Sequence, residues 1–330
     1  MWENEITIMK NAVRAAAAVA EAIAASMTRD DARLKQDASP VTLADYAVQA
    51  IVHRHLAAAF PGDAMIAEED NDDLHDPRHA AMIERLAGLL AAREPGWSAD
   101  ELVAHIGRGH ARESGRGRCW VLDPVDGTKG FLRGDQYAIA LALLVDGRPV
   151  AGVLGCPRLE LTTENGDSRR GWLCLGDGRR AWAESLDGGA TRALKVNVKR
   201  NAADLVLCES VESGHSAHDV TGILAARQGV SARPLRMDSQ AKYAAVAAGL
   251  ADVYVRWPTR VDYREKIWDH AAGVVLVESA GGLVNDVRGQ PLDFTRGRTL
   301  AANRGVLAGA GGMARDFLRM VEEHARATLP

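Results

Sequence analysis

Long hydrophobic runs are absent from this 330-residue sequence, and positive charge is not in excess. No stretch approaches the ~18 consecutive apolar residues that a membrane-spanning helix needs. The first five residues are acidic and lack the basic and then apolar layout of a secretory signal peptide. The formal net charge of −4 gives no overall basic footprint for nucleic acid. We therefore expect a cytoplasmic protein with neither a membrane nor a nucleic acid as its partner.

Cysteine is scarce, and the sequence has no internal repeat and no low-complexity tract. The four cysteines are widely spaced and form no C-x-x-C pair; they are Cys119, Cys156, Cys174 and Cys208. This spacing argues against a zinc site and against a disulfide framework. We expect half-buried thiols that stay reduced, as is usual in the cytoplasm.

The remaining composition is that of an ordinary globular protein, with 47% hydrophobic and 25% charged residues. Periodicity predicts helices over residues 3–28, 240–248, 269–280 and 313–328, and helical spacing also follows Thr42 up to Phe60. Apolar runs predict strands over residues 137–145, 150–155, 172–175, 194–198, 205–208, 252–256, 283–284 and 299–301. Asp146-Gly147 is a strong hairpin signal. This order suits stacked layers of helices and sheets, in an N-terminal half over 1–155 and a C-terminal half over 156–330.

The most informative stretch is Trp120–Phe131, which reads W-V-L-D-P-V-D-G-T-K-G-F. The apolar residues before Asp123 suit the end of a buried strand, and Pro124 holds Asp123 away from helical geometry. Asp126 follows, and Gly127 permits a tight turn into a helix at Thr128. Two carboxylates beside unpaired peptide N–H groups suit a divalent cation next to a phosphate. The simpler interpretation is a strand-to-helix loop with a capped helix.

Two further acidic segments make the simpler interpretation less attractive. Glu68-Glu69-Asp70 follows an apolar run, and Trp268-Asp269-His270-Ala271-Ala272-Gly273 opens a later helix. Together the Glu-Glu pair, D-P-x-D-G-T and W-D-x-x-A-G resemble, in sequence and order, the signatures of the inositol monophosphatase superfamily. The resemblance implies the layered α-β-α-β-α sandwich of the inositol monophosphatase and fructose-1,6-bisphosphatase type. It also implies a magnesium-dependent, lithium-sensitive phosphatase that forms no phosphoenzyme.

The resemblance assigns two or three Mg²⁺ ions to the site. Glu68, Asp123 and the Val125 carbonyl would hold one ion, and Asp123 would bridge to a second ion shared with Asp126 and Asp269. Thr128 and Asp45 would orient the attacking water, while the amides of Gly127 and Thr128 would hold the phosphate. The segment Ser39–Asp45 matches the S-P-V-T-x-x-D pattern in which this acid occurs.

Two of these acids also have a purely structural interpretation. Asp45 lies three residues after Thr42, so the two could form a helix capping box. Asp269 could be the N-cap of its helix, since aspartate is favoured there, and a cap carboxylate still has a second oxygen for a metal.

Within the superfamily, the sequence most resembles the 3′(2′),5′-bisphosphate nucleotidases, over nearly its whole length. The supporting stretches include Asp238–Tyr243 (D-S-Q-A-K-Y), Gly249–Arg256 and Glu265–Gly273. The resemblance places five side chains around a nucleotide bisphosphate: His215, Ser216, Ser239, Lys242 and Arg256. Lys242 and Arg256 supply the positive charge that a second phosphate needs, and arginine can grip two of its oxygens. Without the resemblance, both would be interpreted as ordinary surface charges.

We therefore expect hydrolysis of the 3′-phosphate of adenosine 3′,5′-bisphosphate, or of its 5′-phosphosulfate form, with a role in sulfur assimilation. One alternative is a phosphatase of the same superfamily that acts on an inositol phosphate or a sugar bisphosphate. A second alternative, of a different class, is a non-catalytic nucleotide-binding sensor, which should have lost a metal ligand. Every expected acid is present in this sequence.

Overall fold

A computed structural model describes residues 2–26, 43–199, 201–211, 218–258, 260 and 262–329. In the N-terminal part, the main helices are α1 (Glu3–Ser26), α2 (Leu43–Ala59), α3 (Ala80–Ala91), α4 (Ala99–Gly107) and α5 (Thr128–Arg133). The later helices are α6 (His218–Gln228), α7 (Ala241–Ala247), α8 (Ala271–Ser279) and α9 (Met313–Thr328). The short 3₁₀ turns in the described residues are η2 (Asp73–His75), η3 (Pro77–His79) and η4 (Ala202–Asp204).

The first sheet has seven strands in the order in which they occur in the chain. They are β1 (Ala64–Ala67), β2 (Arg118–Asp126), β3 (Ala138–Val145), β4 (Arg148–Thr162), β5 (Ser168–Gly176), β6 (Ala181–Ser185) and β7 (Thr191–Leu194). β1 and β2 are parallel, and every later neighbour pair is antiparallel. The β3–β4 turn has positive φ at Asp146 and Gly147, as the hairpin signal predicted.

The second sheet has five strands in the order β10-β9-β11-β13-β12. They are β9 (Leu207–Glu209), β10 (Leu235–Arg236), β11 (Val253–Arg256), β12 (Leu283–Asn285) and β13 (Val306–Gly309). A separate parallel pair joins β8 (Val198–Lys199) to β14 (Gly311–Gly312). The predicted division at residue 155 lies inside β4, and the first sheet continues as far as Leu194.

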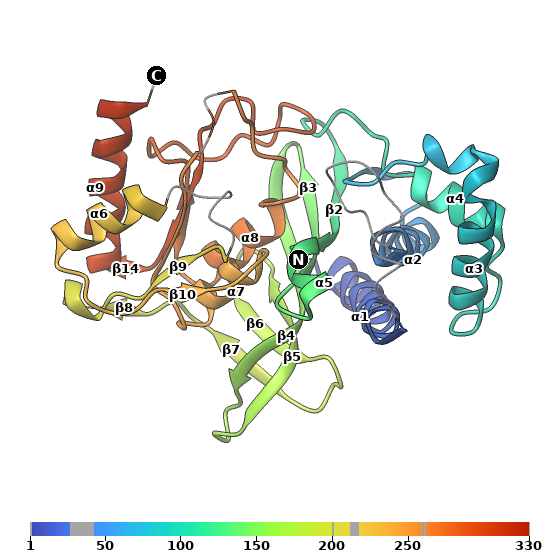
Figure 1. Ribbon diagram of the computed structural model, residues 1–330, viewed down its shortest axis with the longest axis horizontal. Coiled ribbons are helices and arrows are strands. Elements are labelled where there is room, and N and C mark those ends of the chain that lie inside the picture. The colour runs from blue at the N-terminus through green and yellow to red at the C-terminus, as the bar shows by residue number, and fades with distance from the viewer. Residues whose placement is uncertain are drawn as a thin grey trace.

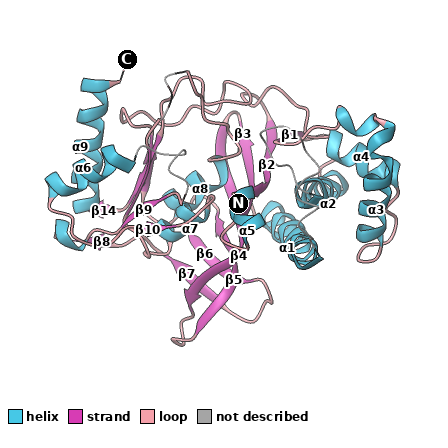
Figure 2. Ribbon diagram, in the orientation of Figure 1, coloured by secondary structure: helices cyan, strands magenta, loops and turns pink. Residues whose placement is uncertain are grey.

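Helices and sheets alternate in five layers (Figures 1 and 2). α6 and α9 lie outside the second sheet, α7 and α8 lie between the two sheets, and α1 and α2 cover the far face of the first sheet. The first sheet is buried on both faces because alternate side chains face different helices. On β2, Trp120 and Leu122 belong to the core shared with α1 and α2, while Cys119 and Val121 belong to the core around α7 and α8. The predicted α-β-α-β-α sandwich is confirmed.

Several predicted elements need correction. Thr299 makes only an isolated bridge to Lys266, so the strand predicted over 299–301 is wrong. The strand predicted over 194–198 is interrupted, because β7 ends at Leu194 and β8 begins at Val198. β6, α6 and β13 had no counterpart in the sequence prediction. The four cysteines are free thiols and are fully buried rather than half-buried.

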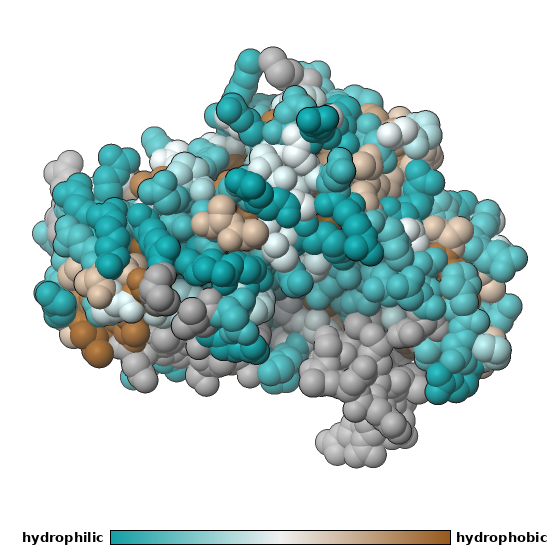
Figure 3. Space-filling model, turned by 90° about the horizontal axis from the view of Figure 1, so that it is seen from above, coloured by the Kyte–Doolittle hydropathy of each residue, from teal (hydrophilic) through white to brown (hydrophobic). Residues whose placement is uncertain are grey.

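The face of the molecule in Figure 3 is mainly hydrophilic, with hydrophobic residues in small separate areas. In the described part of the chain, we find no helix with the length and apolar character that crossing a membrane requires.

Candidate active site

A β-bulge in β2 brings the two aspartates of D-P-V-D to the same face of the first sheet. Asp123 lies opposite Ala140 of β3 and Asp126 lies opposite Ala138, so three steps along β2 match two along β3. Residues three apart in a regular strand would face opposite sides, and the extra residue of a bulge removes this difference. Both carboxylates therefore lie on the face that α8 covers, where Asp269 also lies.

Glu68 reaches the site because β1 runs parallel to β2. Ala67 pairs with Leu122, and the Glu68 N–H donates to the Leu122 carbonyl at 3.3 Å. Parallel strands bring their carboxyl ends to one edge, so Glu68 emerges beside Asp123. Arg298 fixes this strand end, since its guanidinium donates to the Ala67 carbonyl at 2.6 Å. The same guanidinium lies 4.7 Å from the centre of the Trp268 ring, next to Asp269.

Five carboxylates from four segments influence one another's protonation. Burial, followed by repulsion from Glu68 and Asp126, raises the pKa of Asp123 well above its usual value. Desolvation by the surrounding protein, followed by repulsion from Asp269 and Asp45, raises the pKa of Glu68, although its side chain still reaches solvent. Burial raises the pKa of Asp269 to about 6, although Arg256 opposes this shift. The structure thus brings together all five acids that the sequence singled out.

One carboxylate oxygen of this cluster, Oδ1 of Asp123, is buried without a hydrogen-bond partner among the described residues. Asp123 is 2% exposed, and its Oδ1 accepts no hydrogen bond from any residue that the structure describes. A buried carboxylate oxygen without a partner is costly, and a bound cation would remove that cost. The cluster of oxygen donors therefore fits a hard divalent cation such as Mg²⁺.

Thr128 is the first residue of α5, after Gly127 with φ of +86°. Its hydroxyl donates to the Val125 carbonyl at 3.2 Å, which leaves a second lone pair on that oxygen for a cation. A Cβ on Gly127 would lie 2.9 Å from Cβ of Ser239, so glycine also permits the 238–240 turn to pack here. Ser239 has φ of +69°, and its hydroxyl accepts a hydrogen bond from the N–H of Ala241, the first residue of α7.

The predicted substrate contacts fall into three groups. His215 and Ser216 lie outside the described residues, as do Ser39 of the S-P-V-T-x-x-D pattern and Thr42 of the predicted capping box. Lys242 is 4% exposed, and its Nζ lies 3.4 Å from the Met237 carbonyl and 5.3 Å from the Tyr254 ring centre. Arg256 is half-buried at the end of β11 and forms ion pairs with Glu265 and Asp269.

The structure corrects the interpretation of Asp269 as a helix cap. α8 begins at Ala271 with His270 as the N-cap residue, and the His270 side chain makes no capping bond among the described residues. Asp269 lies in the turn before it, with a carboxylate oxygen 3.6 Å from Arg256 Nη2.

Glu265 and His270 are site neighbours that the sequence did not single out. Carboxylate and imidazole atoms of Glu265, Asp269 and His270 lie within 4.8 Å of one another. Tyr243 Oη lies 2.7 Å from His270 Nδ1, and Arg256 Nε lies 2.8 Å from Glu265 Oε2. Because a guanidinium already neutralises Glu265, this trio is better described as an ion-pair network than as a second metal centre.

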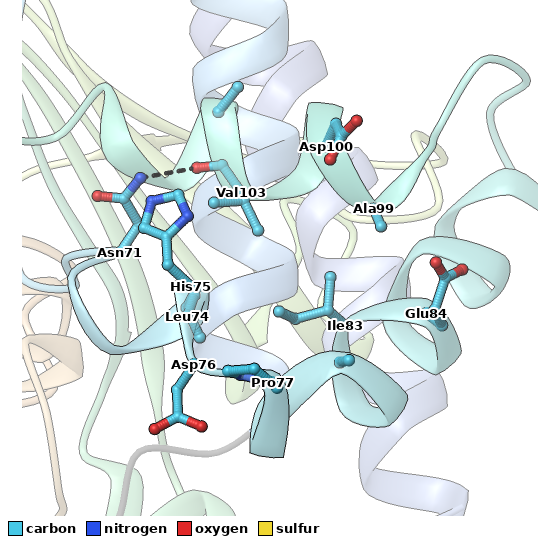
Figure 4. A pocket seen from close by; sticks show the side chains of 12 residues that line it. Asn71, Leu74, His75, Asp76, Pro77, Ile83, Glu84, Ala99, Asp100 and Val103 are labelled. Atoms are coloured by element: carbon cyan, nitrogen blue, oxygen red, sulfur yellow. Dashed lines mark hydrogen bonds between the residues drawn. The ribbon is translucent and has the colours of Figure 1, made fainter.

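The cavities away from the acid cluster differ in charge. A cavity of about 330 Å³ between η2, η3, α3 and α4 has Asp76, Glu84 and Asp100 in its lining and no lysine or arginine (Figure 4). Such a lining disfavours a phosphate. A cavity of about 310 Å³ next to the 238–240 turn is instead lined by Arg158, Arg170 and Arg236, with Asp135 and Asp238.

A sequence model described as the inositol monophosphatase family matches residues 2–318. The chain belongs to this family. It is 39% identical to a 3′(2′),5′-bisphosphate nucleotidase of Oryza sativa, over 98% of this chain and 94% of the relative. It is 40% identical to a protein of the same name from Schizosaccharomyces pombe, over 89% of this chain and 86% of the relative.

Two solved structures share the fold. The extragenic suppressor protein suhB of Bartonella henselae superimposes with a TM-score of 0.65 at 21% identity, covering 97% of this chain and 99% of that chain. The IMPase of Thermotoga maritima superimposes with a TM-score of 0.64 at 19% identity, covering 99% of both chains.

Proposed function

We propose that this chain is a magnesium-dependent phosphatase that hydrolyses the 3′-phosphate of adenosine 3′,5′-bisphosphate to give AMP and phosphate. The proposal rests on the buried Asp123 carboxylate, one oxygen of which accepts no hydrogen bond from the described residues, among four further carboxylates. The nucleotidase names of the full-length relatives support the substrate.

The family resemblance implies two metal positions. At metal position 1, Glu68, Asp123 and the Val125 carbonyl would hold an ion, and at metal position 2, Asp123, Asp126 and Asp269 would hold an ion. When bound, Mg²⁺ ions would offset the charge of the phosphate and lower the pKa of water. The protein contributes oxygen ligands that are already in place, so its side chains need little rearrangement when the cations bind.

The attacking water would be oriented by Asp45 and Thr128. Asp45 is 2% exposed in the first turn of α2, and it lies close enough to raise the pKa of Asp123 and Glu68. A carboxylate can accept a proton from water, and a threonine hydroxyl can both accept and donate, so together they can fix one orientation of the water. The amides of Gly127 and Thr128 would bind the phosphate oxygens.

The second phosphate would be recognised by Lys242 and Arg256, and the nucleoside by His215, Ser216 and Ser239. Burial lowers the pKa of Lys242, and attraction to Asp126 opposes this shift without cancelling it. A buried ammonium whose charge is only partly offset is unfavourable, and an incoming phosphate would offset it further.

The test is phosphate release from adenosine 3′,5′-bisphosphate, inositol 1-phosphate and AMP, each with and without Mg²⁺. We expect turnover that requires Mg²⁺ and that is fastest on the bisphosphate. Equal turnover of inositol 1-phosphate would favour a broader phosphatase, and binding of the nucleotide without turnover would favour a sensor.

The finer properties implied by the family form part of the same proposal. Lithium should inhibit at metal position 2, because a monovalent ion supplies less charge to the leaving oxygen. The 5′-phosphosulfate form of the nucleotide should also be a substrate, which would give the protein a role in sulfur assimilation in the cytoplasm. Sodium at equal concentration is the control for lithium.

A further inference from the structure

Gln240 contacts three different parts of the site. Its peptide N–H donates to Asp126 Oδ2 at 2.5 Å. Its side-chain Nε2 donates to the Trp268 carbonyl at 2.9 Å, and its Oε1 accepts from the Gly273 N–H at 3.3 Å. The side chain is 2% exposed, so water cannot easily replace these bonds. Only one orientation of the amide satisfies both side-chain partners.

We propose that Gln240 is the positioning residue of metal position 2, a role that rests on the proposed function. Asp126 and Asp269 are the two ligands that this position does not share, and they come from segments far apart in the chain. The Gln240 peptide N–H bonds Asp126 directly, and its side chain bonds the backbone on both sides of Asp269. One residue therefore fixes the separation between the two carboxylates.

The contact with Gly273 explains how Asp269 remains available. Gly273 is the third residue of α8, and its N–H is the usual target of an N-cap side chain. The Gln240 side chain, at the start of α7, accepts a hydrogen bond from this N–H. α8 therefore does not need the Asp269 carboxylate as a cap. Glycine is required here because a Cβ would lie 2.3 Å from the Tyr243 ring, and Tyr243 follows Gln240 by one helical turn. The close α7–α8 contact thus brings the amide within reach.

A second buried glutamine serves the other metal position in the same way. Gln49 is 0% exposed on α2, one turn after Asp45. Its Nε2 donates to the carbonyls of Glu69 and Ile106 at 2.8 and 2.9 Å, and its Oε1 accepts from the Glu69 N–H at 3.2 Å. Gln49 therefore fixes the backbone next to Glu68, as Gln240 fixes the backbone next to Asp269.

The experiment compares Gln240→Met with Gln49→Met, which have similar shape and lose buried amides of the same kind. Mg²⁺ binding to the full-length protein is measured by titration calorimetry without substrate, and thermal unfolding is measured with and without Mg²⁺. Removing a partner in the outer shell of a metal site typically weakens binding by roughly ten- to a hundred-fold. We expect Gln240→Met to weaken one Mg²⁺ binding event by about ten-fold or more. Gln49→Met should weaken the other event.

The control for a purely structural effect is Asn303→Leu. Asn303 is also a buried amide, and it bonds to Asp286, Pro291 and Asp293 but to none of the ligand segments. The Asn303→Leu variant should have a lower melting temperature than the wild type and unchanged Mg²⁺ binding. If Gln240→Met does not fold, Gln240→Asn replaces it, since this amide stays polar and uncharged but is one methylene shorter.

The outcomes separate this inference from the proposed function. A wild-type protein that binds no Mg²⁺ would overturn the proposed function itself. A wild-type protein that binds Mg²⁺, with unchanged binding in a folded Gln240 variant, would overturn only the positioning role. The same result follows if the Gln240 and Gln49 variants weaken the same binding event.

Discussion

Arg256 Nε lies 2.8 Å from Glu265 Oε2, in a pair that is largely shielded from solvent. The other end of the guanidinium lies 3.6 Å from Asp269, so Arg256 stands between a structural acid and a proposed metal ligand. Burial opposes the charge of Arg256, but the combined attraction of Glu265, Asp269 and neighbouring groups outweighs burial and raises the arginine pKa. The guanidinium at the edge of the site therefore keeps its positive charge, and that charge is already partly offset by Glu265 and Asp269.

Replacing Arg256 should change substrate preference. Loss of a charge-assisted hydrogen bond to the second phosphate is worth roughly 1.5–3 kcal/mol, or about ten- to a hundred-fold in kcat/KM. We expect Arg256→Ala to lower kcat/KM on adenosine 3′,5′-bisphosphate by this factor and to affect a simple phosphate monoester much less. The matched control is Arg260→Ala, whose guanidinium pairs with exposed Asp262. Equal losses on both substrates would contradict the assignment.

Asp123→Asn should separate activity from stability. With Mg²⁺ present, we expect turnover to fall by at least about a hundred-fold, because both metal positions lose a shared charge. Without Mg²⁺, the variant should melt at a higher temperature than the wild type. The raised pKa of Asp123 means that folding disfavours its charged form at neutral pH, and asparagine carries no charge. Near-normal turnover in the folded variant would show that Asp123 is not the bridging ligand.

Asp45 and Thr128 should behave as one catalytic unit. Thr128→Ala and Asp45→Asn should each slow turnover, and the double variant should be little slower than the slower single variant. The measurement is kcat for the three proteins at saturating Mg²⁺ and substrate. Strictly additive losses would instead indicate that Asp45 stabilises the start of α2 and that Thr128 acts independently.

His53 should make the protein less stable in acid. Burial, opposed by the hydrogen bond of Nδ1 with the His105 carbonyl at 2.8 Å, lowers the pKa of His53 from 6.5 to about 4. The unfolded chain binds this proton below pH 6.5, whereas the folded chain does not until about pH 4. The contribution is therefore present above pH 6.5 and is lost as the pH falls to about 4, by about 3 kcal/mol in total.

The check is the free energy of unfolding in urea as a function of pH, for the wild type and His53→Asn. Asparagine can still donate to the His105 carbonyl but does not titrate. The difference in stability between the two proteins should shrink between pH 6.5 and pH 4. A difference that stays constant across this range would mean that His53 keeps its ordinary pKa.

The acids of the site could be predicted from the sequence because each belongs to a short local pattern. Asp123, Asp126 and Asp269 stand at element ends that proline, glycine and tryptophan mark, and the structure brings them together. The residues that hold the acids in place left no such signal. Gln240 and Gln49 contact partners that are distant along the chain, and a buried amide cannot be told from a surface amide by its neighbours in sequence.

The errors in the fold prediction have similar causes. β13 is a run of only four residues, too short for periodicity to distinguish strand from loop, yet it pairs with both β11 and β12. The segment 299–301 has a comparable apolar character, but the only pairing described for it is the Lys266–Thr299 bridge. Which short run enters a sheet depends on neighbours supplied by other parts of the chain.

The four buried thiols can be used to detect local opening of the folded protein. Cys119, Cys156 and Cys174 lie in the first sheet, and Cys208 lies in the second. Burial raises the pKa of Cys119 and of Cys208 to about 12, so an alkylating reagent meets neither an accessible sulfur nor a thiolate while the protein is folded. Each labelling event then shows that the sheet around that cysteine has opened to solvent. Following the labelling of Cys208 against that of the other three would time the opening of the two sheets separately, without any engineered cysteine.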